Sequence, residues 1–154
     1  MKNRIDGVSF VRPWVKEGMT ETFEHSRVRE GIFSLGYNET WVKVMQHKLC
    51  EGFLRPMAEY LAIKNREWRS SSVAVECSYY MMAWPMMSFM MVNDKAFKTL
   101  RAVITSARLI PWRKAPSLPE RFAQNSPEGM KSLDARWRAW IRKLPWTSSS
   151  KKRC

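Results

Sequence analysis

The longest apolar stretch of this chain, residues 71–92, constrains its fold more than any other feature. Glu76 is the only charged residue within it, and a bilayer core needs about 20 predominantly apolar residues in a helix. Met, Tyr, Ser and Trp fill the stretch in place of Leu and Ile, so its hydropathy is moderate. The stretch has two interpretations: a transmembrane helix over residues 70–93, kinked at Pro85, or the core of a soluble domain, as a buried helix or as a strand followed by a short helix. The length of the stretch and the composition of its flanks favour the transmembrane helix.

The positive charge of the chain lies mainly in its C-terminal third. The formal net charge is +13, from 27 Lys and Arg against 14 Asp and Glu. Residues 93–154 carry 15 of these cations and 4 of the acids, a net charge of +11, whereas residues 1–70 have a net charge of +3. An excess of this size requires acidic partners, such as nucleic acid, anionic lipid or acidic protein surfaces.

Local signals in the rest of the chain predict an all-α protein. Asn38 is a helix-capping residue before an apolar stripe, and Gly52 and Pro56 break that stripe into two helices. Residues 126–128 combine a cap, a first-turn proline and a first-turn acid, which predicts a helix start. The expected segments are an extended N-terminal arm (1–37), a hairpin-like pair of amphipathic helices (38–69), the transmembrane helix (70–93), a basic amphipathic helix (94–110), a proline-rich linker (111–125), a basic, tryptophan-containing amphipathic helix (126–145) and a tail (146–154).

The two basic amphipathic helices of the C-terminal third allow three interpretations. In the helix over residues 94–110, Phe97, Leu100 and Ile104 share one face and the cations lie off it. The cations could meet anionic headgroups, with tryptophans at the acyl boundary. They could instead neutralise nucleic-acid phosphates. The third interpretation is a solvated basic face over an ordinary protein core.

The chain lacks the motifs of the common catalytic sites. Its six glycines form no phosphate-binding loop, and His25 and His47 are lone histidines rather than a metal-binding pair. Its three cysteines have no metal-ligand spacing, and their odd number argues against a disulfide framework and fits a reducing compartment. We therefore expect no enzyme, no catalytic residue, no metal site and no cofactor.

Three groups of candidate site residues follow from these patterns. Glu76 is a candidate for an intramembrane ion pair with another subunit, because a lone carboxylate in a bilayer is costly. Three tryptophans are candidate interfacial anchors, namely Trp68, Trp137 and Trp140. Ten cations are candidates for contacting lipid or phosphate, namely Lys64, Arg66, Arg69, Lys95, Lys98, Arg101, Arg136, Arg138, Arg142 and Lys143.

These patterns favour a non-catalytic accessory subunit of a mitochondrial inner-membrane complex of the respiratory chain or ATP synthase. It would be a single-pass protein that contacts other subunits and anionic phospholipid such as cardiolipin. The alternative is a basic structural protein of an organellar ribosome or other ribonucleoprotein, with RNA bound by its C-terminal third. A third hypothesis is a helical regulator whose residues 127–144 dock in a partner groove.

Overall fold

A computed structural model describes residues 13–70, 72–107 and 116–145 of the chain. These residues form eight helices and one two-stranded antiparallel hairpin, so the expectation of a mostly helical protein is confirmed. The elements are α1 Pro13–His25, β1 Arg27–Arg29, β2 Ile32–Ser34, α2 Glu39–Cys50, α3 Met57–Ala62, α4 Asn65–Ser70, α5 Val73–Val92, α6 Asp94–Ala107, α7 Leu118–Asn125 and α8 Gly129–Lys143.

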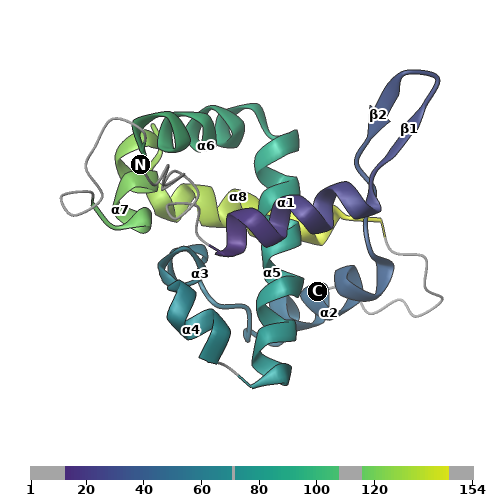
Figure 1. Ribbon diagram of the computed structural model, residues 1–154, viewed down its shortest axis with the longest axis horizontal. Helices are drawn as coiled ribbons and strands as arrows, with labels where there is room; N and C mark the ends of the chain where they lie inside the picture. The colour runs from purple at the N-terminus through teal and green to yellow at the C-terminus, as the bar shows by residue number, and fades with distance from the viewer. Residues whose placement is uncertain (1–12, 71, 108–115, 146–154) are drawn as a thin grey trace, which may run out of the picture.

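Helix α5 runs through the middle of the protein, and the other helices lie around it (Figure 1). All residues from 82 to 90 are buried, and Met82, Met86, Met87 and Met90 are each at most 1% exposed. Unbranched methionine side chains adapt to the irregular gaps between the surrounding helices. The helix continues through Pro85.

The expected transmembrane helix over residues 70–93, and with it the single-pass assignment, is wrong. The predicted helix exists, but none of the helices in the described part of the chain combines the length and apolarity needed to cross a bilayer. The polypeptide itself covers the methionine-rich half of α5, through α1, α2, α3, α6 and α8. Length and low charge are shared by core helices and membrane helices, so the stretch alone did not separate the two readings.

The expected extended arm is also wrong for residues 13–34, which form a helix and a hairpin. Helix α1 packs along α5 and buries Trp14 and Val15. Gly18 lies at the crossing, where an added Cβ would stand 2.6 Å from the Ala83 carbonyl oxygen. Residues 1–12 lie outside the described part of the chain, so the arm expected there is not addressed.

A hydroxyl pair fastens the same crossing one turn further along α1. Thr22 Oγ1 and Ser88 Oγ, both buried, share a hydrogen bond of 3.2 Å. Burial of a hydroxyl is costly unless it has such a partner, so the two side chains also fix the register of α1 on α5. Helix α1 therefore belongs to the core although its apolar stripe is short.

The segment of the expected helical pair contains two helices, α2 and α3, and a further short helix, α4; α2 packs on α8 and α5, and α3 on α5, α7 and α8. The Trp41 backbone N–H donates to Asn38 Oδ1 at 3.2 Å, which is the expected cap of α2. The chain then breaks between Glu51 and Pro56, as Gly52 and Pro56 predicted. Phe53 falls in this break and is 73% exposed, so the apolar stripe does not extend through it.

The C-terminal third differs from the prediction in three places. Helix α6 buries Ala96 and Thr99 together with Leu100, whereas Phe97 and Ile104 are 46% and 42% exposed. Residues 118–125 of the predicted linker form α7, which begins with a capping box between Ser117 and Glu120. Helix α8 starts two residues later than the proline signal indicated. Residues 108–115 and the tail 146–154 lie outside the described residues.

The close approach of α1 to α5 predicts the effect of Gly18→Ala. The new methyl group would meet the Ala83 carbonyl and Met87 Cβ, at 2.6 and 2.9 Å. Overpacking should lower the free energy of unfolding by about 1–3 kcal/mol, which exceeds the gain of about 1 kcal/mol from the higher helix propensity of alanine. Urea unfolding of the purified chain measures the loss. Lys16→Ala on the exposed side of α1 is the control, with an expected change within about 0.5 kcal/mol. A Gly18→Ala variant as stable as the wild type would contradict the packing.

Candidate nucleic-acid interface

Three of the ten candidate cations are held in ion pairs that stabilise the fold. Lys95 of α6 and Arg136 of α8 both pair with Glu128, the residue before α8. The hydrogen bond from Lys95, followed by that from Ser132, lowers the pKa of Glu128. Because Glu128 joins α6 to the start of α8, Lys95 and Arg136 already have a partner within the fold and are poorer candidates for an external ligand, although the Lys95 side chain is 67% exposed.

The third paired cation, Arg138, clamps the loop between α2 and α3. Its Nε donates to Asp134 Oδ2 at 2.6 Å, and its Nη2 donates to the Leu54 and Arg55 carbonyls at 2.8 and 3.0 Å. Asp134 Oδ1 in turn accepts the Met57 backbone N–H at 2.7 Å, at the start of α3. Helix α3 has no side-chain cap of its own, so α8 supplies one from across the fold.

The other candidate cations are exposed and form no ion pair within the described residues. They are Lys64 just before α4, Arg66 and Arg69 on α4, Lys98 and Arg101 on α6, and Arg142 and Lys143 in the last turn of α8. Lys131, on α8, is also exposed and was not among the candidates. It lies eleven residues before Arg142, about three turns, and so on the same side of the helix.

The acids of the C-terminal third are mostly used inside the fold. Residues 93–154 contain Asp94, Glu120, Glu128 and Asp134. Glu128 and Asp134 are engaged as described, and Glu120 accepts hydrogen bonds from the Ser117 side chain and backbone, which lower its pKa. Three of the four acids therefore have structural partners, and none of these partners is one of the exposed candidate cations other than Lys95.

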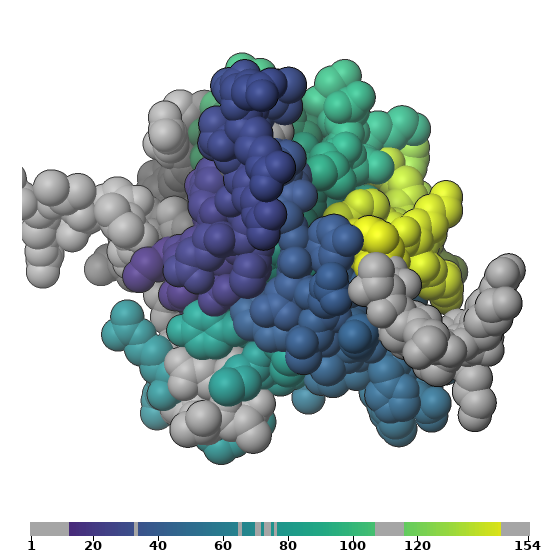
Figure 2. Space-filling view, turned by 90° about the vertical axis from the view of Figure 1, so that its right-hand side faces the viewer, coloured from purple at the N-terminus to yellow at the C-terminus, as the bar shows by residue number. Residues whose placement is uncertain are grey.

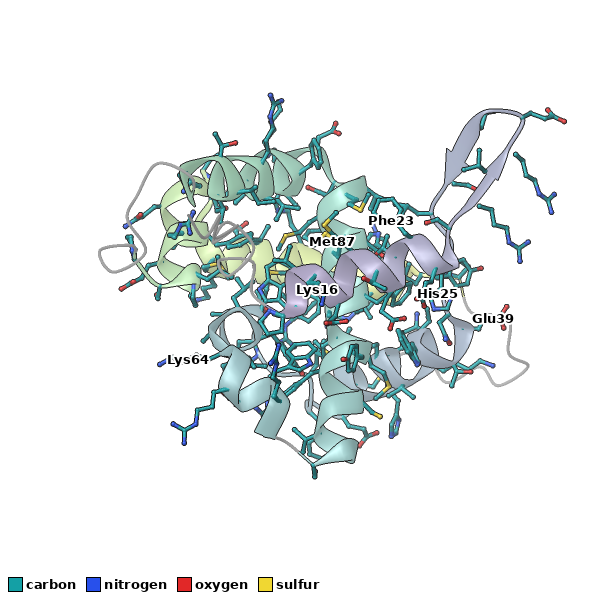
Figure 3. All side chains as sticks on the ribbon, in the orientation of Figure 1. Lys16, Phe23, His25, Glu39, Lys64 and Met87 are labelled. Carbon is teal, nitrogen blue, oxygen red and sulfur yellow. The ribbon has the colours of Figure 1, made fainter. Side chains whose placement is uncertain are left out.

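The exposed cations do not gather on one face. Figure 1 shows α4 beside the beginning of α5, whereas α6 leads away from its end. Helix α5 has 20 residues and is therefore about 30 Å long, so the cations of α4 and those of α6 lie near its opposite ends. In Figure 3, Lys64 projects outward at the α4 end.

The candidate tryptophan anchors lie in the protein core. Trp68 and Trp137 are 4% and 0% exposed, and the ring of Trp68 contacts those of Tyr79 and Tyr80. Trp140 is partly buried and packs on Phe89, with ring centroids 6.0 Å apart. These positions fit neither lipid anchoring nor base stacking; helical spacing with other apolar residues is instead the sign of packing.

Glu76 lies in α5, but its side chain is not among those that the structure describes. Its expected intramembrane ion pair required a membrane-spanning helix, and no helix of the described residues is long and apolar enough to be one. His25 Nε2 is 3.9 Å from Glu21 Oε2, and its ring meets the Trp41 ring edge-on. Burial, followed by the charge of Glu24, raises the pKa of Glu21, with His25 opposing the rise. Cys50 is disulfide-bonded, whereas Cys77 is an exposed free thiol. The odd number of cysteines argued against a framework of several disulfides and did not exclude a single one.

Sequence reasoning also missed two cations in the hairpin, Arg27 and Arg29. They fall in the segment expected to be an extended arm, but they lie on β1, whose three residues are all exposed. Residues 30 and 31, Glu-Gly between two short alternating runs, are the sequence signal that could have revealed the turn.

Comparison with known proteins adds no relative. No family model matches the chain, and neither a curated protein nor a solved structure matches it.

The clamp between α8 and the α2–α3 loop predicts that Asp134→Ala is destabilising. The substitution removes the cap of α3 and the partner of Arg138, and we expect a loss of about 1–2 kcal/mol. Urea unfolding measures it, with Arg142→Ala on the same helix as the exposed control, expected within about 0.5 kcal/mol. Equal stability of the two variants would show that the clamp contributes nothing.

Proposed function

We propose that this chain is a non-catalytic, basic structural protein of a ribonucleoprotein, and that it binds RNA through the exposed cations of its C-terminal third. The observation that carries the proposal is the uncompensated charge. Lys98, Arg101 and Lys131 are exposed without an ion pair in the described residues, as are Arg142 and Lys143. Cations that remain free in the fold can neutralise phosphates and release their counterions.

The arrangement of the cations favours RNA over a lipid surface. A bilayer is locally flat, so one protein can present only one side to it. The cations of α4 and α6 lie at opposite ends of α5 (Figure 1). Folded RNA can surround a small protein and meet charge on several sides, as basic proteins of ribonucleoproteins require. The burial of Trp68 and Trp137 also removes the aromatic anchors that a lipid interface would use.

The accessory-subunit reading loses the observation on which it depended. It needed residues 70–93 to cross a bilayer, and α5 is instead the centre of the core. We retain an organelle as the proposed location, because the composition that suggested it is unchanged. An organellar ribosome is the particle that we propose first.

The proposal predicts a specific loss of RNA binding in Lys98→Gln/Arg101→Gln. The slope of log K against log salt is negative, and removing two phosphate contacts should reduce its magnitude by about 1.4–1.8. Fluorescence anisotropy with bulk transfer RNA, between about 50 and 200 mM salt, measures the slope. Both residues are exposed on α6, so the fold should be unaffected.

Lys16→Gln/Lys43→Gln is the matched control, because it removes two exposed lysines from the N-terminal half. Its slope should change by less than about half as much. Two results would overturn the proposal: wild-type protein that does not bind RNA at about 50 mM salt, or wild-type protein that binds cardiolipin vesicles but not RNA under the same conditions.

A further inference from the structure

The β1–β2 hairpin stands clear of the helical body. Figure 1 shows it projecting beyond the end of α1, and in Figure 2 it lies at the top of the face in view. All of β1 is exposed, and Val28 and Ile32 are 68% and 70% exposed. The two strands pair only with each other, in the register Val28 to Phe33 and Arg29 to Ile32. The hairpin residues whose burial is described, namely 27–32 and 34, therefore lie outside the core.

The hairpin is nevertheless built to hold a fixed shape. Glu30 and Gly31 both have positive φ, at 50° and 76°, which is the tight two-residue turn that matches strand twist. At its base, an added Cβ on Gly36 would lie 1.6 Å from the His25 carbonyl oxygen, so only glycine allows the returning strand to pass the end of α1. Ser26 Oγ also donates to the Thr22 carbonyl at 2.6 Å.

This base connects the hairpin to the core, because Thr22 is itself hydrogen-bonded to Ser88 of α5. Figure 3 places His25 at the hairpin end of α1 and Lys16 at the other end. An isolated two-stranded hairpin is marginally stable in water. One that is braced at its base and exposed along its length is suited to reaching a partner.

The chemistry of the hairpin suits a polyanion. Arg27 and Arg29 are two residues apart on β1, so their side chains leave the same face, about 7 Å apart. Guanidinium groups donate to phosphate oxygens in pairs and stack on unpaired bases. Ile32 lies opposite Arg29 and adds an apolar surface on that face. Glu30, at the turn, is the only acid in residues 27–34.

We propose that the β1–β2 hairpin contacts an unpaired loop or bulge of RNA, with Arg27 and Arg29 on its phosphates and bases. The deep, narrow major groove of an A-form RNA duplex excludes side chains, so the hairpin could not read bases there. Unpaired bases in a loop or bulge are open to stacking and hydrogen bonding. This inference rests on the proposed function and adds a second contact, outside the C-terminal third. It assigns the choice of RNA site to the hairpin and general phosphate binding to the helices.

The experiment compares wild-type protein with Arg27→Gln/Arg29→Gln on two probes, a stem–loop RNA with an internal bulge and a perfect RNA duplex of the same length. We expect wild type to prefer the bulged RNA, and the variant to lose about tenfold in affinity for it and little for the duplex. Lys16→Gln/Lys43→Gln is the matched control and should keep the preference. The thermal midpoint should not move, because β1 is fully exposed.

The outcomes separate this inference from the proposed function. If wild type binds neither RNA, the proposed function fails. If wild type binds RNA and the hairpin variant binds both probes as wild type does, the hairpin assignment alone is overturned. Exposed strand edges can also pair between copies. Sedimentation of the wild type tests for such a dimer. If the wild type is a dimer, and Val28→Thr/Ile32→Thr makes it a monomer without changing its RNA binding, the hairpin assignment is overturned.

Discussion

The structure depends on the burial of the methionine-rich half of α5 by the rest of the chain. Helix α1 covers one side of it and can approach because Gly18 presents no side chain to the Ala83 carbonyl. The remaining helices close the other sides, so that Met86 and Met90 are fully buried. This burial is the main favourable term in folding a chain of this size, and every other element is positioned by it.

The polar contacts between helices act on this core and determine which charges remain outside. Asp134 and Arg138 tie α8 to the α2–α3 loop, and Gln46 of α2 donates to the Ile141 and Leu144 carbonyls at the end of α8. Each contact satisfies backbone groups that a helix end leaves open. Because the chain has 27 Lys and Arg against 14 Asp and Glu, an excess of positive charge remains after these pairings, and cations on α4, α6 and α8 are exposed.

The same arrangement gives the two proposed contacts different characters. The helical cations are spread around the body, which suits general attraction to phosphate. The hairpin is a single braced projection with two arginines on one face, which suits one local feature of an RNA. The hairpin contact depends on the α1–α5 crossing, because the hairpin continues directly from α1 and its base is fastened through Thr22 and Ser88.

Sequence alone determined the features that are local to a few residues. The cap at Asn38, the break at Gly52 and Pro56, and the extent of the helix over residues 73–92 follow from short-range geometry and propensity. Only the tertiary structure decided what surrounds that helix, which face of α6 is buried and which cations are paired. These three features depend on contacts between helices that are distant in the sequence. For example, α1 packs on α5 where Thr22 is hydrogen-bonded to Ser88, 66 positions away. An apolar stretch carries the same local pattern whether lipid or protein covers it, so its surroundings had to come from the contacts.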